Sequence, residues 1–209
     1  MRIKVKICGL TRLEDAFFAT SLGAHALGFI FYSKSPRYIN PEKAKEIIDQ
    51  LPPFVQVVGV FVNEEKEKIK KIAQFCNLNL IQLHGNESPE FCETLGLPCI
   101  KAFSVKDKES LKFLSVYKGK VKGILLDTYK KGKFGGTGET FDWNLAIEAK
   151  ALGMPLILAG GLKPENVKKA INIVKPFAID VNSGIEKAPG IKDKYLMERL
   201  FKEIQDEIA

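Results

Sequence analysis

The sequence predicts a closed (β/α)8 barrel, an α/β fold formed by a single domain over residues 1–209. Short apolar runs rich in branched residues occur eight times, and an amphipathic stretch follows each of them. Such runs suit buried parallel strands, and the stretches between them suit the helices that cover those strands. The composition does not change along the chain, and 209 residues are enough for one substantial core. The count of eight favours a TIM barrel over the alternative, an open doubly wound sheet.

The strands are expected where branched apolar residues cluster between turn signals. They lie at residues 3–7, 26–31, 56–61, 80–83, 99–103, 123–127, 155–159 and 177–181. Each run is short and almost continuously apolar, as is typical of strands that are buried on both faces. Glycine or proline marks the return to several of them, for example in "LGAH" at 22–25 and "LPPF" at 51–54.

The helices are expected where apolar residues recur with helical spacing. They lie at residues 13–22, 41–51, 64–75, 88–95, 106–114, 144–152, 164–174 and 192–208. Proline supports three of the helix starts, at Pro41, Pro89 and Pro164, because its fixed backbone angle suits the first helical turn. Thr11 is a candidate cap for the first helix.

The loops that follow the strands are longer and more polar than the loops that return to them. They include "YSKSPRYIN" at 32–40, the segment 127–143, "AGGLKPEN" at 159–166 and "NSGIEKAPGIKD" at 182–193. Active sites of (β/α)8 barrels lie on the face formed by these strand-to-helix loops. The sequence therefore predicts an active site at the carboxyl ends of the strands.

Five ionisable residues are expected at this face. Cys8, Asp127 and Asp180 fall at or near strand ends, Arg37 lies in the loop after the second strand, and His84 follows the fourth. A catalytic thiol needs a shifted pKa or a partner, because few thiols are ionised at neutral pH. Asp127 either caps the next loop as a solvated carboxylate or, if the glycine-rich loop partly desolvates it, acts as an acid. His84 either contacts the substrate or satisfies neighbouring backbone groups.

Small residues after the last two strands predict a phosphate site. Gly160 and Gly161 follow the seventh strand, whereas Asn182, Ser183 and Gly184 follow the eighth. Backbone N–H groups and a helix N-terminus bind anions at this position of many barrels. The alternative is a pair of helix-entry turns that need glycine for backbone geometry.

The glycine-rich segment 132–141, "GKFGGTGETF", resembles a nucleotide-binding loop only superficially. It lacks a lysine followed by Ser or Thr, and it lacks GxGxxG. We expect a mobile flap over the mouth of the barrel, with a surface excursion as the alternative.

The composition narrows the class of protein. Four cysteines without a CxxC pair and only two histidines argue against a zinc cluster or a disulfide framework, so we expect no metal, reduced thiols and a cytoplasmic protein. No apolar run is long enough to cross a membrane. The net charge of +7 comes largely from lysines interleaved with glutamates, which indicates solvated helix faces rather than a nucleic-acid surface. A positive field also attracts a small anionic substrate.

Several segments together resemble those of phosphoribosylanthranilate isomerases. They are "KICGLT", "GFIFYSKSPRYI", "VGVFVN", "IQLHG", "LLDT", "GGTGETFDW", "LAGGLKPENV" and "DVNSGIE", and they run in order through nearly the whole chain. The resemblance implies an enzyme of tryptophan biosynthesis. Its reaction is the Amadori rearrangement of N-(5-phosphoribosyl)anthranilate to 1-(2-carboxyphenylamino)-1-deoxyribulose 5-phosphate.

The resemblance also implies roles for individual residues. Asp127 matches the general acid, Cys8 the general base, and Arg37 the group that binds the anthranilate carboxylate. The loop at Gly161 and the segment Asp180, Asn182 and Ser183 match the phosphate site. No metal or organic cofactor is implied, and the sequence is compatible with a homodimer.

Two rival interpretations belong to other classes. A Schiff-base aldolase of the same fold would use Lys101, in "CIKAF". A basic protein that binds nucleic acid would show tight, salt-sensitive binding without isomerase activity.

Overall fold

In the computed structural model, which describes residues 3–128 and 140–205, eight parallel strands close into a barrel in chain order. The strands are β1 (Lys4–Ile7), β2 (Ala26–Ile30), β3 (Gln56–Phe61), β4 (Leu80–Leu83), β5 (Cys99–Val105), β6 (Gly123–Thr128), β7 (Leu156–Leu158) and β8 (Ala178–Val181). The pairing of β1 with β8, from Lys4 opposite Ala178 to Ile7 opposite Val181, closes the ring. The predicted TIM barrel is thereby confirmed.

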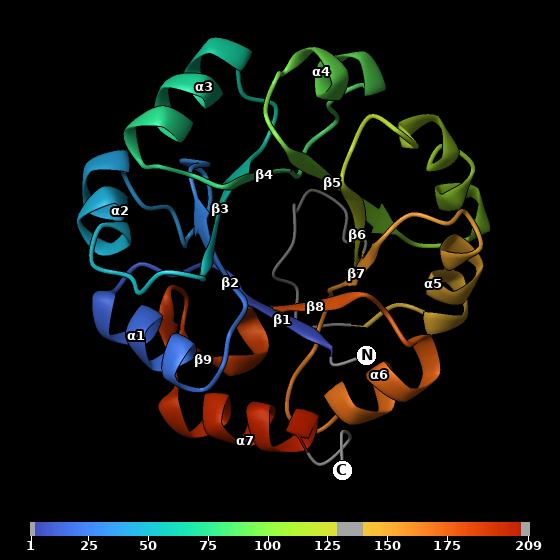
Figure 1. The fold of residues 1–209 in the computed structure, drawn as a ribbon. Coiled ribbons are helices and arrows are strands. Elements are labelled where there is room, and N and C mark those ends of the chain that lie inside the picture. Colours follow the sequence, from blue (N-terminus) through green and yellow to red (C-terminus); the bar gives the residue numbers. More distant parts are fainter. Residues whose placement is uncertain (1–2, 129–139, 206–209) are drawn as a thin grey trace.

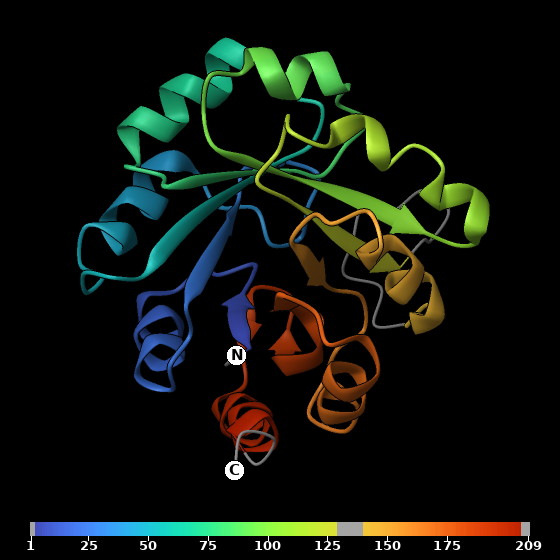
Figure 2. The same ribbon diagram turned by 45° about the vertical axis from the view of Figure 1, so that its right-hand side comes forward.

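Helices surround this ring on the outside, as Figure 1 shows. They are α1 (Leu13–Ser21), α2 (Pro41–Ile48), α3 (Lys66–Phe75), α4 (Pro89–Thr94), α5 (Trp143–Lys150), α6 (Val167–Val174) and α7 (Lys194–Gln205). Helix α7 lies between α6 and α1 and completes the outer layer (Figures 1 and 2). Among the described residues, no helix combines the length and the apolar character that a membrane crossing requires.

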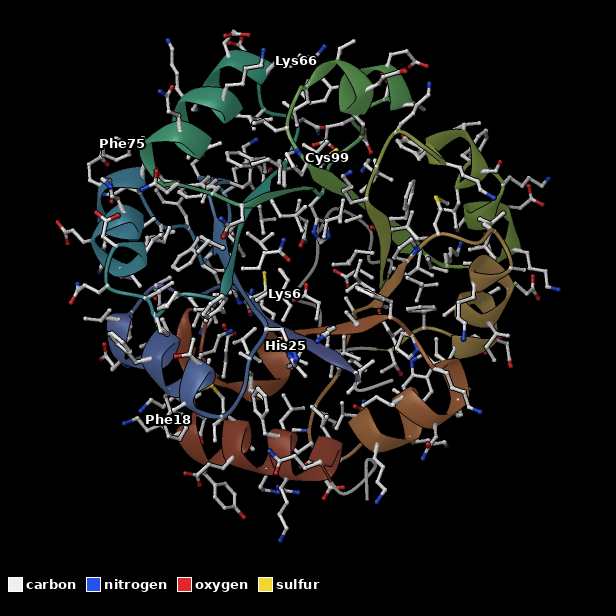
Figure 3. The ribbon with its side chains drawn as sticks, viewed as in Figure 1. Lys6, Phe18, His25, Lys66, Phe75 and Cys99 are labelled. Atoms are coloured by element: carbon white, nitrogen blue, oxygen red, sulfur yellow. The ribbon has the colours of Figure 1, made fainter. Side chains whose placement is uncertain are left out.

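The main core lies between the strands and the helices. Outward-facing strand residues such as Ile7, Leu27 and Leu126 are fully buried there against helix residues such as Ala16 and Val167. Burial of this apolar surface is the main force that holds helices against a sheet. Figure 3 shows Phe18, Lys66 and Phe75 in the outer layer and Lys6 within the ring of strands.

Two of the three helix starts with proline are as predicted. Asn40 and Ser88 cap α2 and α4, and Pro41 and Pro89 occupy the first turns. Pro164 does not start α6, which begins at Val167 after a turn. The reason is that the side chain of Asn166 bonds the loop itself, accepting from the Lys163 N–H and donating to the Gly161 carbonyl.

Two further local expectations are wrong. Residues 106–114 do not form an α-helix, because the reciprocal bonds between Asp107 and Ser110 close a short 3-10 turn, η1 (Lys108–Leu111). A second such turn, η2 (Ser115–Tyr117), follows. Thr11 does not cap α1 but donates its hydroxyl to the Gly190 carbonyl.

That carbonyl belongs to a small hairpin that the sequence did not indicate. Strands β9 (Glu186–Ala188) and β10 (Ile191–Lys192) form it within the long loop after β8, behind the turn η3 (Ser183–Ile185). Their pairing turns the chain back and brings Glu186 and Lys192 together. The hairpin therefore carries two charged side chains to the mouth of the barrel.

Candidate active site

A cavity of about 360 Å³ opens among the loops at the carboxyl ends of the strands. Most of the predicted site residues line it, namely Cys8, Arg37, His84, Asp127, Gly160, Gly161, Asp180, Asn182 and Ser183. Gly184 is the exception and lies behind the cavity wall. The predicted flap, 132–141, lies almost entirely outside the described residues.

Cys8 and Asp127 reach this cavity from strands that are three steps apart around the closed ring. Cys8 follows β1 directly, with its N–H bonded to the Val181 carbonyl at 2.9 Å. Asp127 lies in β6, opposite Ser104 of β5 in the strand register. Both side chains are nearly buried, at 4% and 5% exposure. The two ionisable groups therefore share one largely dehydrated space.

Burial and the neighbouring cations act in opposite directions on the pKa of the Cys8 thiol. Burial raises the pKa of Cys8, because a thiolate loses its hydration in the barrel interior. The positive charge of Lys6 opposes this effect, and that of Lys192 opposes it to a smaller extent. Without these cations the pKa of Cys8 would be higher still.

The carboxylate of Asp127 faces a histidine in a fixed orientation. One oxygen, Oδ1, accepts from the Thr128 N–H at 2.8 Å, and Oδ2 lies 3.4 Å from His84 Nε2. The other ring nitrogen, His84 Nδ1, lies 2.9 Å from the amide nitrogen of Gln82. Because an amide nitrogen only donates, Nδ1 accepts and the imidazole proton resides on Nε2, which faces Asp127 and the cavity.

Arg37 is held by a bidentate ion pair. Its Nε and Nη2 donate to both carboxylate oxygens of Glu186, the shortest distance being 2.7 Å between Nη2 and Oε2. Lys192 Nζ reaches the same carboxylate at 2.9 Å. Burial alone would raise the pKa of Glu186, but its bonds with Arg37 and Lys192 hold that pKa below its usual value.

Glycines in the loops after β7 and β8 pack closely against neighbouring segments, Gly160 against the end of β6 and Gly184 against the loop after β7. A methyl group on Gly160 would come within 3.0 Å of Asp127 Oδ1 and nearer still to Thr128, and the residue has a φ of 85°. A methyl group on Gly184 would overlap the Leu162 carbonyl. Gly161 also has positive φ, at 62°. These contacts turn the backbone of both loops towards the cavity.

Asp180 and Asn182 make polar contacts of their own at the rim. Asp180 Oδ1 accepts from Lys6 Nζ at 2.9 Å, and Asn182 Oδ1 accepts from Lys192 Nζ at the same distance. An ionised Asp180 repels a phosphate. The capacity of this segment to bind an anion therefore resides in its N–H groups and in the hydroxyl of Ser183.

Lys101, the residue of the rival aldolase mechanism, is engaged elsewhere. Its Nζ donates to the carbonyls of Leu83, Gly85 and Ala102 and lies 3.2 Å from Glu87 Oε2. It does not line the cavity. This lysine holds the loop that carries His84, so the Schiff-base alternative is not favoured.

The remaining cysteines are buried thiols outside the site, as expected. Burial raises the pKa of Cys76 to about 11, and the thiol of Cys99 donates to the Cys92 carbonyl. Within residues 3–128 and 140–205, no cluster of His, Cys, Asp and Glu has the arrangement of a metal site.

Several functional candidates escaped the sequence-based reasoning. Lys6, Gln82 and Lys192 are buried polar residues in strands or the hairpin. Glu186 is a further candidate, because it forms ion pairs with both Arg37 and Lys192. The available signal was a charge within an apolar strand, as in "IKVKI" for Lys6. Such a residue is buried only if it has a partner, and the sequence does not identify the partner.

A closed eight-stranded barrel with ionisable side chains gathered at the carboxyl ends of its strands belongs to the barrel enzymes. Comparison with known proteins narrows that class. The model of the N-(5'-phosphoribosyl)anthranilate (PRA) isomerase family matches residues 5–203. The chain belongs to this family, and it is an isomerase.

Individual relatives agree with the family assignment. The N-(5'-phosphoribosyl)anthranilate isomerase of Citrifermentans bemidjiense is 53% identical over 200 residues, which cover 96% of each chain. A dimeric phosphoribosylanthranilate isomerase from Thermotoga maritima, crystallised as monomers, is 43% identical with a TM-score of 0.88. A phosphoribosyl anthranilate isomerase in complex with reduced 1-(o-carboxyphenylamino)-1-deoxyribulose 5-phosphate is 44% identical, also with a TM-score of 0.88. Each structure covers 98% of this chain and is itself covered to 99%.

Proposed function

We propose that this chain converts N-(5-phosphoribosyl)anthranilate to 1-(2-carboxyphenylamino)-1-deoxyribulose 5-phosphate, with Asp127 as general acid and Cys8 as general base. The reaction is the Amadori rearrangement of tryptophan biosynthesis. The observation that carries the proposal is the common cavity of Cys8 and Asp127, within a member of this family. No cofactor takes part, because each step is a proton transfer or a ring opening.

The acid step begins with Asp127 in its protonated form. Asp127 donates its proton to the furanose ring oxygen, the bond between that oxygen and C1 breaks, and the anilino nitrogen forms an iminium with C1. His84 Nε2, at 3.4 Å from Asp127 Oδ2, presents its N–H to the same region. We assign His84 the task of orienting the carboxyl group and the departing ring oxygen.

The base step follows on the opened chain. The iminium makes the proton on C2 acidic, and the thiolate of Cys8 removes it. The resulting enolamine then tautomerises to the ketone. A general acid or base of this kind typically contributes about 10²–10⁴ in rate.

The two ends of the substrate carry the charges that hold it. Glu186 accepts from Nε and Nη2 of Arg37, and Nη1 makes no hydrogen bond with the described residues. We assign this free end of the guanidinium to the anthranilate carboxylate. The backbone N–H groups around Gly160, Gly161 and Ser183, which line the cavity, bind the phosphate. Anchoring at both ends fixes the sugar between acid and base.

The protein also forms a homodimer in this proposal. A T. maritima relative is described as dimeric. In this chain Phe54 is fully exposed with a φ of 72°, in the loop between α2 and β3. Phe177, before β8, is half exposed at the same end of the barrel. We assign these two exposed aromatic side chains to the contact between the subunits. The active-site cavities of both subunits would remain open, because they lie at the carboxyl ends of the strands, opposite Phe54 and Phe177.

We place the enzyme in the cytoplasm and expect neither nucleic acid nor membrane as a partner. All four cysteines are unpaired thiols, as is typical of a reducing compartment. The excess positive charge instead favours the approach of a substrate that carries a carboxylate and a phosphate.

A coupled assay tests the proposed reaction. Anthranilate and phosphoribosyl pyrophosphate, with a phosphoribosyltransferase, generate the unstable substrate in the cuvette, and loss of its fluorescence reports turnover. We expect turnover that depends on the purified chain. A fluorescence decay no faster than the spontaneous breakdown of the substrate would refute the proposed activity.

A further inference from the structure

Lys6 is a buried cation that the mechanism above does not use. It lies in β1 and is only 5% exposed, although lysine is rarely buried without a partner. Side chains two residues apart on a strand point to the same face. Lys6 and Cys8 therefore both face the barrel interior, where Figure 3 shows Lys6.

The ammonium group of Lys6 bridges an acid and the thiol. Its Nζ lies 2.9 Å from Asp180 Oδ1, on the neighbouring strand β8, and its charge acts on the Cys8 thiol. Gly28, on the other neighbouring strand, leaves the space for this contact. A methyl group there would come within 2.7 Å of Cys8 Sγ and 3.0 Å of Lys6 Nζ. Backbone on one side and a carboxylate on the other thus keep the cation beside the sulfur.

Among the charges around Cys8, that of Lys6 favours the thiolate most strongly. Asp180, next to Lys6, raises the pKa of Cys8, whereas Lys192 of the hairpin lowers it to a smaller extent than Lys6 does. Asp127 and His84 line the cavity from the far wall. Burial alone would lower the pKa of Lys6, but Asp180 and Cys8 raise it above its usual value, so Lys6 stays charged across the working range.

We propose that Lys6 is a positioning residue that stabilises the thiolate of Cys8 and so sets the fraction of enzyme carrying an active base. Asp180 keeps Lys6 protonated and fixes its ammonium group below the sulfur. This proposal rests on the role of Cys8 as general base. An opposite charge within about 4–6 Å typically changes a pKa by about 1–3 units, which corresponds to a change in thiolate of about ten- to a thousandfold.

The rate at which iodoacetamide alkylates Cys8 tests the proposal without any turnover. The rate is followed by mass spectrometry of the peptide that contains Cys8, as a function of pH, in Lys6→Met and in the wild type. We expect alkylation at pH 7.5 to be at least about tenfold slower in Lys6→Met. Lys4→Met is the matched control, because Lys4 is an exposed lysine on the same strand, and its rate should equal that of the wild type.

Steady-state kinetics provide a second readout that a purely structural role would not change. In Lys6→Met, kcat at neutral pH should fall at least about tenfold and recover as pH rises, because a weaker acid still ionises at higher pH. KM should change little. Lys6→Gln, which retains a hydrogen bond to Asp180, replaces Lys6→Met if circular dichroism shows that the latter does not fold.

Equal alkylation rates at Cys8 in the wild type and in a folded, uncharged Lys6 variant would overturn the proposal. That failure is distinct from failure of the proposed function, which Cys8→Ser tests by itself. If Cys8→Ser is inactive but Lys6→Met alkylates normally, only the role of Lys6 is lost. If Cys8→Ser turns over normally, Cys8 is not the base and the catalytic role of Lys6 is lost with it.

Discussion

Arg37 and Glu186 lie 149 positions apart in the chain and form a bidentate ion pair, with Nη2 2.7 Å from Oε2. The two side chains come from the loop after β2 and from the hairpin after β8. A planar guanidinium that is held along one edge presents its other edge in a fixed direction. Glu186 therefore orients the group that we assign to the substrate carboxylate.

The first prediction concerns the acid and the base. Cys8→Ser and Asp127→Asn should each reduce kcat at least about a hundredfold in the fluorescence assay, because each removes one proton-transfer group. Both variants should show the far-UV circular dichroism spectrum of the wild type. Cys76→Ser, a buried thiol outside the cavity, is the control and should keep near-normal turnover. Turnover above a tenth of the wild-type rate in either site variant would remove that residue from the mechanism.

The second prediction separates contact from orientation at Arg37. Arg37→Ala should raise KM at least about tenfold, as expected when a charged hydrogen bond worth about 1.5–3 kcal/mol is lost. Glu186→Gln should raise KM less, because the guanidinium remains but is less firmly held. The exposed pair of Arg199 and Glu165 supplies the control, and Arg199→Ala should leave KM unchanged. An unaltered KM in Arg37→Ala would refute the contact.

The third prediction uses the close approach of the loops. Gly160→Ala should destabilise the fold by at least about 1 kcal/mol, because φ is 85° and a methyl group meets Thr128. It should also reduce kcat, since the displaced atoms include Asp127 Oδ1. Urea unfolding and the fluorescence assay measure the two effects. Gly23→Ala has a φ of 98° but an open surrounding, so it should cost stability without loss of kcat. An equal kcat in Gly160→Ala and Gly23→Ala would show that the close approach of Gly160 to Asp127 does not affect catalysis.

The fourth prediction follows from the lowered pKa of Glu186. A carboxyl whose pKa is lower in the folded state than in the unfolded chain stabilises the fold above the unfolded value, and this stabilisation is lost as pH falls through the folded value. Between about pH 6 and pH 3 the wild type should therefore lose more unfolding free energy than Glu186→Gln. Urea midpoints across this range measure the difference. Glu67→Gln, at an exposed site, is the control and should retain the wild-type dependence of stability on pH. The same wild-type dependence in Glu186→Gln would show that the ion pair with Arg37 contributes nothing to stability.

The fifth prediction concerns assembly. Phe54→Glu should convert the proposed homodimer to a monomer, because it places a charge at the fully exposed aromatic position of the amino-terminal face. Light scattering coupled to gel filtration gives the mass. The assay should show retained turnover, since the catalytic cavity is at the other end of the barrel. Phe113→Glu, an exposed phenylalanine in another segment, should leave the mass unaltered. A monomeric wild type would contradict the proposal outright.

The strands and the face of the barrel that carries the site were predictable from local patterns. A short, continuously apolar run such as Gly123–Thr128 buries its side chains when it forms a parallel strand that is covered on both faces. Polar residues at the carboxyl ends of such strands meet once the strands align. The positions of Cys8 and Asp127 at one cavity follow from strand order and side-chain alternation alone. Because strand order brings the strand ends together, the separate segments that resemble one family meet at a single site.

The contacts that tune those residues were decided only by the tertiary structure. Lys6 with Asp180 and Arg37 with Glu186 join residues more than a hundred positions apart, and the hairpin that carries Glu186 had no strong periodic signal. The 3-10 turns in place of the predicted helix at 106–114 likewise depend on a local pair, Asp107 and Ser110. A sequence determines which residues must leave water, because that depends on each side chain. Which charge stabilises a buried partner depends on distances of a few ångströms, and only the closed barrel sets them.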